Sequence, residues 1–279
     1  MTDNGLFQDK FIQLNGLRFH YLEWGRADAP PLILLHGFAD HAHRWDTFSR
    51  AMQDAWRVLA LDMRGHGESD WADDYSRDKM VEDVAAWVET LGLERVAVVG
   101  HSMGARIGYL YAAQNPARVT RLVIVDNAPE INPRGIRRMR DSVLSQEDFA
   151  SPDELFRAAR AANARPSDED MWNRVRYGLK QRDDGRWVWR YDKELRSPTR
   201  PRVNRDPAQE WAVLPQIQCP TLLVYGDDSD MVSAEIMERM QRAISNSRVV
   251  VVKDSGHSVQ TDNPAGFVMA VKPFLLAGS

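Results

Sequence analysis

The sequence has 279 residues, of which 43% are hydrophobic and 27% are charged, as in an ordinary globular protein. The 36 Lys and Arg side chains nearly balance the 40 Asp and Glu side chains, and the net charge of -4 argues against a nucleic-acid binder with a uniformly basic surface. No apolar run reaches the roughly 18 residues that a membrane-spanning helix requires, so we expect no membrane association.

Cysteine usage and the first residues bear on the cellular compartment. The single cysteine, Cys219, cannot form a disulfide within the chain. Residues 1–10 are polar and lack the basic-then-apolar order of a secretory signal peptide. We therefore expect a reduced, cytoplasmic setting.

The first predicted element is a β-hairpin formed by residues 11–14 and 17–24. Asn15-Gly16 lies between the two segments, and this dipeptide readily adopts the positive φ angles of a tight turn. Further short apolar runs follow along the chain, and each has the length of a buried strand. These runs are residues 32–35, 56–61, 95–99, 121–125, 221–225 and 248–252.

Helical segments lie between these predicted strands. Apolar residues recur at three- and four-residue spacing over 80–91, and Gly92 follows as a helix C-cap. Two more helices are predicted at 105–115, which Pro116 ends, and at 234–244. Apolar strands that alternate with helices predict an α/β fold, with a mostly parallel, doubly wound sheet flanked by helices.

The alternation of strands and helices is interrupted between Asp126 and Pro215. This interval is rich in Arg, Asp and Trp and lacks an apolar run like those on either side. It contains helix-like stretches at 152–162 and 169–180, so we interpret it as a helical lid inserted between two strands. The predicted organisation is a first part of the core at 1–129, a lid at 130–214 and a second part of the core at 215–279.

The sharpest signal for chemistry is Gly100-His101-Ser102-Met103-Gly104, which joins a predicted strand to a predicted helix. A serine on so sharp a turn has a strained backbone, and glycines at both ends remove Cβ atoms that would otherwise clash. The hydroxyl then projects above the sheet at a helix N-terminus, where N–H groups and the helix dipole favour developing negative charge. This pattern predicts that Ser102 is a nucleophile.

Together with three further motifs, this turn resembles the α/β-hydrolase superfamily over nearly the whole chain. The motifs are His36-Gly37-Phe38, Asp62-Met63-Arg64-Gly65-His66-Gly67-Glu68-Ser69 and Ser255-Gly256-His257. The resemblance implies an oxyanion hole formed by the backbone N–H groups of Phe38 and Met103. It also implies that the second motif is a structural turn, so we do not expect His66 to be a base.

A serine hydroxyl needs a base to take its proton, and histidine suits that role at neutral pH. The family order along the chain is nucleophile, acid and then histidine. Only His257 follows Ser102, because the seven histidines stand at positions 20, 36, 41, 43, 66, 101 and 257. We therefore predict that His257 is the base.

The resemblance leaves two candidates for the aspartate that orients this histidine. Most family members supply it after the strand equivalent to 221–225, commonly as Gly-x-x-Asp, but here Ser229 has that spacing and Asp230 follows it. Some lid-bearing members supply it one strand earlier, where this chain has Asp126. We favour Asp126 and keep Asp230 as the alternative acid.

Three further features have competing interpretations. His41-Ala42-His43 is similar to the His-x-His ligands of zinc hydrolases, but a metal site needs more ligands, so we expect no metal. Arg138 lies in an arginine cluster that suits an anionic substrate group, although a solvated helix face has the same pattern. Trp187 is a candidate for the substrate-facing side of the lid or for the lid's own core.

The motifs predict a serine hydrolase that cleaves a small carboxylic ester through an acyl-enzyme and needs no cofactor. Amides, lactones and thioesters are related substrates. Carbon–carbon bond hydrolysis and cofactor-free perhydrolysis are alternatives on the same fold, and a non-catalytic small-molecule receptor is the alternative from another class.

The charge is unevenly divided between the predicted core and lid. Residues 129–210 carry 18 cations and 15 anions, whereas the rest of the chain carries 18 cations and 25 anions. A more basic lid predicts a preference for substrates that carry a carboxylate, with Arg138 as a contact.

Overall fold

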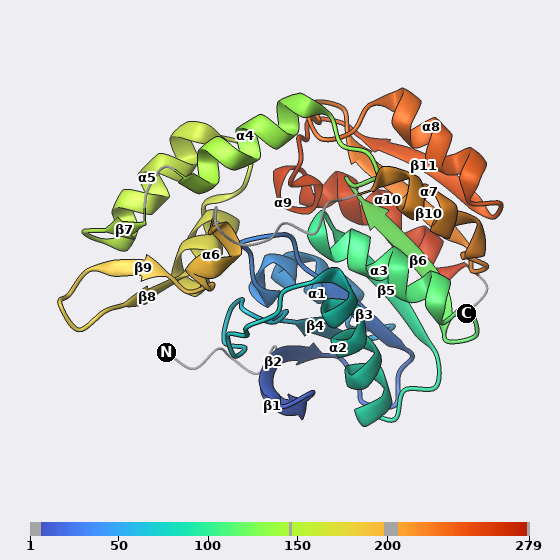
Figure 1. The fold of residues 1–279 in the computed structure, drawn as a ribbon, viewed down its shortest axis with the longest axis horizontal. Coiled ribbons are helices and arrows are strands. Elements are labelled where there is room, and N and C mark those ends of the chain that lie inside the picture. Colours follow the sequence, from blue (N-terminus) through green and yellow to red (C-terminus); the bar gives the residue numbers. More distant parts are fainter. Residues whose placement is uncertain (1–6, 145–146, 198–205, 278–279) are drawn as a thin grey trace.

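An eight-stranded sheet forms the centre of the molecule (Figure 1). The computed structural model describes residues 7–144, 147–197 and 206–277. The second strand of the N-terminal hairpin is antiparallel to both of its neighbours, and all other neighbouring strands of this sheet pair in parallel. In the order in which they lie side by side, the strands are β1 (Gln8–Leu14), β2 (Leu17–Trp24), β4 (Arg57–Leu61), β3 (Pro31–Leu35), β5 (Val96–His101), β6 (Val119–Val125), β10 (Thr221–Gly226) and β11 (Ser247–Val252).

The predicted hairpin and the six predicted apolar strands are confirmed. Leu14 pairs with Leu17 at the end of the hairpin, and the turn residues Asn15 and Gly16 have φ angles of 52° and 81°. Each predicted apolar run forms one strand of the sheet, with ends that differ by a few residues at most.

Helices cover both faces of the sheet. On one face, α2 (Arg77–Thr90), α3 (Met103–Gln114) and α8 (Ala234–Ala243) bury apolar side chains against the strands. On the other face, α1 (Asp46–Met52) and α10 (Pro264–Leu276) do the same. Neighbouring residues of β5 lie in opposite cores, Val98 in the first and Val99 in the second. This is the doubly wound α/β sheet that the sequence predicts.

The described residues between β6 and β10 form four helices, two short 3-10 helices and a small sheet (Figure 1). These elements are α4 (Pro133–Leu144), β7 (Asp148–Phe149), α5 (Pro152–Ala162), α6 (Asp168–Gly178), β8 (Leu179–Gln181), β9 (Trp187–Trp189), η2 (Lys193–Arg196), α7 (Pro207–Val213) and η3 (Leu214–Gln216). The two predicted helices are confirmed as α5 and α6. We call residues 130–214 the lid, as predicted from the sequence.

The lid is less purely helical than the sequence predicts. Its three strands form an antiparallel sheet in the order β7-β9-β8. Strands of two or three residues are too short to show the apolar alternation by which a strand is recognised. The turn at Gly185, with a φ angle of 81°, is the one local signal of this sheet.

The lid also has an apolar core of its own. Phe149, Leu155, Val175 and Leu179 are buried in it, and Trp187 packs against this cluster. Trp187 is therefore partly buried and packs on the core of the lid. Among the described residues, no helix is long and apolar enough to cross a membrane.

Candidate active site

Ser102 occupies a strained turn between β5 and α3. Its φ and ψ angles are 52° and -114°, outside the conformations that residues other than glycine usually adopt. The turn is tight enough that a Cβ at Gly100 would overlap the carbonyl oxygen of Gly104. A Cβ at Gly104 would overlap the carbonyl oxygen of Leu35, in the neighbouring strand β3. Both glycines are thus required for the turn that presents the Ser102 hydroxyl.

The Gly104 contact predicts a large loss of stability. In Gly104→Ala the new methyl group meets backbone, which cannot rotate away, so the free energy of unfolding should fall by about 3 kcal/mol or more. Gly108→Ala on the same helix is the matched control, because its Cβ would lie 3.2 Å from a side-chain methyl of Val98. Urea unfolding should show a change within about 1 kcal/mol for this control. Equal losses in the two variants would contradict the steric explanation.

Three side chains form a continuous hydrogen-bonded chain at the carboxyl ends of the strands. The Nε2 atom of His257 lies 3.0 Å from the Ser102 hydroxyl oxygen, and its Nδ1 atom lies 2.6 Å from an Asp126 carboxylate oxygen. Because a carboxylate only accepts, Nδ1 carries the proton and Nε2 is free to accept the serine proton. Ser102, His257 and Asp126 therefore have the geometry of a nucleophile, its base and the orienting acid.

The two candidate acids have different surroundings. Asp126 is fully buried at the end of β6, with a φ angle of 50°. Asp230 instead forms an ion pair with Arg138, with oxygen–nitrogen distances of 2.6 and 2.7 Å. The structure thus brings Asp126 to His257 and places Asp230 and Arg138 together on the surface, where both are partly exposed.

Ser229 binds the carboxylate of Asp126. Its hydroxyl donates a hydrogen bond of 2.9 Å to the same Asp126 oxygen that accepts from His257. Ser229 has the spacing at which most family members carry the acid, so it holds the carboxylate rather than supplying one. Burial raises the pKa of Asp126, although the hydrogen bonds from His257 and Ser229 favour its charged form.

The predicted oxyanion donors lie on the two segments that flank the serine. Met103 is the first residue of α3, next to Ser102. Phe38 follows Gly37, whose Cβ would lie 3.4 Å from the Cβ of Ser102. The Gly104 N–H donates to the carbonyl oxygen of His36 over 3.0 Å and ties the two segments together. Neither predicted donor N–H is bonded to another group in the part of the chain that the structure describes.

His101 supports the loop that carries His257. Its Nε2–H donates a hydrogen bond of 2.8 Å to the carbonyl oxygen of His257, and the two rings lie 4.7 Å apart between centroids. Burial lowers the pKa of His101 to about 3, so this ring stays neutral and keeps its donor. The sequence marked His101 only as part of the serine turn, and its contact with a residue 156 positions away had no local signal.

The two histidines that resemble zinc ligands are engaged elsewhere. His43 bonds to Asp46 over 3.1 Å and stacks on Tyr177 of the lid at a centroid distance of 3.4 Å. His41 bonds to the carbonyl oxygen of Arg174 at 3.4 Å. Within 7–144, 147–197 and 206–277, no group of three or more His, Cys, Asp or Glu side chains is placed to hold a metal ion.

Buried neutral histidines predict a loss of stability in mild acid. Burial lowers the pKa values of His41, His66 and His101 to about 3, whereas an unfolded histidine titrates near 6.5. Below pH 6.5 the unfolded chain therefore binds protons that the folded chain does not. The free energy of unfolding should fall with pH, by about 1.4 kcal/mol per pH unit for each histidine.

Urea unfolding at intervals between pH 7 and pH 5 measures this dependence. His66→Gln removes one of the three groups, so its stability should depend on pH less steeply than that of the parent protein. A parent stability that stayed constant over this range would contradict the prediction.

Known proteins resemble this chain over nearly its full length. Residues 30–264 match the family model described as the α/β-hydrolase fold. Esterase Rv0045c of Mycobacterium tuberculosis is 31% identical over 263 residues, which cover 91% of this chain and 85% of that protein. Its crystal structure has a TM-score of 0.78 at 29% identity and covers 98% of this chain and 92% of the other.

Two further similarities extend across most of both chains. The sn-1-specific diacylglycerol lipase ABHD11 of Mus musculus is 28% identical over 265 residues, covering 90% of this chain and 82% of the lipase. An α/β hydrolase from Novosphingobium aromaticivorans has a TM-score of 0.83 at 26% identity, with 98% and 99% of the two chains covered. The resemblance found in the sequence is confirmed: the chain belongs to the α/β-hydrolase family and is an enzyme of the hydrolase class.

Proposed function

We propose that the protein is a serine hydrolase that cleaves small carboxylic esters through an acyl-enzyme on Ser102. The observation that carries this proposal is the hydrogen-bonded chain from Ser102 through His257 to Asp126, with distances of 3.0 and 2.6 Å. A relative at 31% identity over 91% of the chain is named an esterase, which supports the choice of substrate class.

The geometry supports a two-step reaction. His257 takes the proton of the Ser102 hydroxyl as the oxygen attacks the carbonyl carbon, and the Phe38 and Met103 N–H groups stabilise the oxyanion. His257 then gives its proton to the departing alcohol, which leaves the acyl group bonded to Ser102. In the second step a water molecule gives a proton to His257 and attacks the acyl carbon. The bond between the acyl carbon and the Ser102 oxygen then breaks, His257 returns the proton to that oxygen, and the acid leaves. These steps use only groups of the protein and water.

Covalent labelling tests the proposed nucleophile directly. A fluorophosphonate reacts with an activated serine, and we expect one adduct per chain, mapped to Ser102 by peptide mass spectrometry. Loss of para-nitrophenyl butyrate hydrolysis should follow the extent of labelling. Hydrolysis that survives complete labelling would overturn the serine mechanism, and a protein that neither reacts nor hydrolyses esters would favour the receptor alternative.

A further inference from the structure

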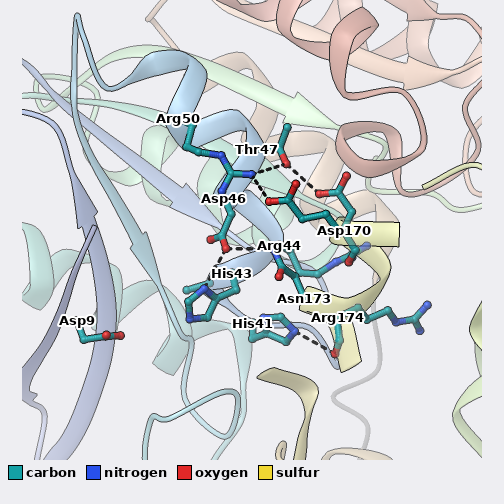
Figure 2. A network of polar contacts seen from close by, with 12 residues as sticks. Asp9, His41, His43, Arg44, Asp46, Thr47, Arg50, Asp170, Asn173 and Arg174 are labelled. Carbon is teal, nitrogen blue, oxygen red and sulfur yellow. Dashed lines mark hydrogen bonds and ion pairs between the residues drawn. The ribbon is translucent and has the colours of Figure 1, made fainter. Parts of the chain in front are cut away.

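Helix α6 of the lid is attached to the core by a network of polar contacts (Figure 2). The Asn173 amide donates to Asp46 over 3.2 Å, and the Thr47 hydroxyl donates to Asp170 over 3.0 Å. Asp170 and Asn173 are buried, and both core partners lie at the start of α1. These contacts set the direction in which the other side chains of α6 project.

Arg174 is next to this network in sequence but does not join it through its side chain. Figure 2 shows the Arg174 guanidinium pointing away from the other labelled residues, and only its carbonyl oxygen accepts a bond, from His41. The side chain is exposed, and no carboxylate of the described residues forms an ion pair with it. An arginine in this state offers five N–H donors that the described protein does not use.

The surroundings of Arg174 are more enclosed than those of an ordinary surface arginine. Burial lowers the pKa of its guanidinium, and the positive charge of Arg44 lowers it further. The side chain nevertheless reaches solvent.

Hydrogen bonds place this part of α6 beside both loops of the proposed active site. The Arg44 guanidinium donates to the Asp170 carbonyl oxygen over 3.3 Å and to the Thr261 hydroxyl, next to Asp262, over 2.9 Å. The charges of Asp40 and Asp262 act on the Arg174 guanidinium. Asp40 donates its N–H to the carbonyl oxygen of Gly37, in the loop that carries the proposed oxyanion donor. Asp262 accepts the N–H of Gly256 over 2.8 Å, directly before His257.

Both of these aspartates are already occupied by other partners. Asp40 forms an ion pair with Arg44 at 3.0 Å. The two oxygens of Asp262 accept hydrogen bonds from Gly256 and Asn163, each 2.8 Å long. Among the residues that the structure describes, Arg174 is thus left as a cation without a direct partner at the edge of the site.

We propose that Arg174 binds a carboxylate of the substrate, so that the preferred esters carry a carboxylate at a distance from the scissile bond. This inference rests on the proposed ester hydrolysis and adds the substrate class to it. The planar guanidinium matches a carboxylate in a two-point contact.

Arg174 thereby takes the role that the sequence assigned to Arg138. Arg138, on α4, forms a partly exposed ion pair with Asp230. The expected preference for anionic substrates is kept, but a different lid arginine carries it.

Two pairs of esters test the preference. The mono-para-nitrophenyl esters of adipic and suberic acid carry a free carboxylate, and para-nitrophenyl hexanoate and octanoate are their neutral counterparts of equal chain length. In Arg174→Gln the ratio of kcat/KM between the charged and the neutral ester should fall roughly 10- to 100-fold, the value of a charge-assisted hydrogen bond. In Arg174→Lys it should fall less, because the charge stays but the two-point contact is lost.

Arg176→Gln is the matched control on the same helix. Arg176 is also exposed, but its guanidinium lies 6.0 Å from the Trp172 ring, about 200° around the helix from Arg174. This variant changes the net charge by the same amount and should leave the ratio unchanged. Equal ratios in the parent, Arg174→Gln and Arg176→Gln proteins would overturn the inference while leaving ester hydrolysis intact.

A binding measurement keeps the two proposals separable. Adipate, which is not hydrolysed, should raise the melting temperature of the parent protein and of Arg176→Gln, but not that of Arg174→Gln. If adipate stabilises the parent in this pattern while none of the esters is hydrolysed, the anion site stands and the proposed function fails. If esters are hydrolysed and adipate acts equally on all three proteins, only the anion site fails.

Discussion

Ser102→Ala should lower kcat for para-nitrophenyl butyrate on the order of a million-fold, the loss expected when a serine nucleophile is removed from an intact triad. The loss is this large because His257 then has no hydroxyl proton to accept, and only binding and the oxyanion donors remain. Alanine keeps the Cβ of a residue whose φ angle is 52°, so the thermal unfolding transition should stay nearly unchanged.

A distant serine provides the control for this variant. Ser247 begins β11, and its hydroxyl bonds to the Ile244 carbonyl oxygen over 2.7 Å, far along the strand from His257. Ser247→Ala should retain the parent kcat. If Ser102→Ala retained a tenth of the parent turnover in a purified, correctly folded sample, Ser102 would not be the nucleophile.

Asp126→Asn should lower kcat on the order of ten-thousand-fold. An asparagine can present an amide N–H to His257 and so favour the wrong tautomer, with the proton on Nε2 facing Ser102. It also removes the charge that stabilises the imidazolium formed during attack. Steady-state kinetics with para-nitrophenyl butyrate, supported by circular dichroism to verify the fold, measures this loss.

Asp230→Asn is the matched comparison, because Asp230 is the other candidate acid. It should change kcat little, since it breaks only the ion pair with Arg138, which is more than half exposed. The reverse ranking of the two asparagine variants would transfer the role to Asp230. Adding Ser229→Asp to Asp126→Asn should restore part of the lost rate, because Ser229 already lies 2.9 Å from the Asp126 carboxylate.

The core and the serine turn could be predicted from the sequence because their signals are local. Each buried strand is a continuous apolar run, and Gly100 and Gly104 bracket Ser102 within five residues. Gly104 has no room for a side chain because it meets the backbone of Leu35, and such a requirement leaves a visible glycine in the sequence. His257 was found by order along the chain, since no other histidine follows Ser102.

The acid was harder to predict because loop conformation decides which aspartate reaches the histidine. Asp126 and Asp230 both follow strands of the sheet, and both are close in the sequence to Asn or Ser residues typical of turns. What separates them is the positive φ angle of Asp126 and its burial beneath His257. Neither the φ angle nor the burial of an aspartate can be predicted from its residue type alone.

The lid was the least predictable part because its contacts are distant in sequence. Arg138 and Arg174 are equivalent by composition, yet the first meets Asp230 and the second remains without an ion-pair partner among the described residues. The stacking of His43 on Tyr177 likewise joins segments 134 positions apart. Only the packing of the lid on the core distinguishes these arginines.

The backbone conformation at two residues of the proposed triad lowers the stability of the fold, although catalysis needs both side chains. Ser102 and Asp126 both hold left-handed φ angles, 52° and 50°, which cost on the order of 1 to 3 kcal/mol at a residue other than glycine. Glycine at either position would relieve that cost and remove the hydroxyl or the carboxylate. Selection for a higher free energy of unfolding and selection for a higher catalytic rate therefore act in opposite directions at these two positions. A search for stabilised variants has to leave both residues unchanged.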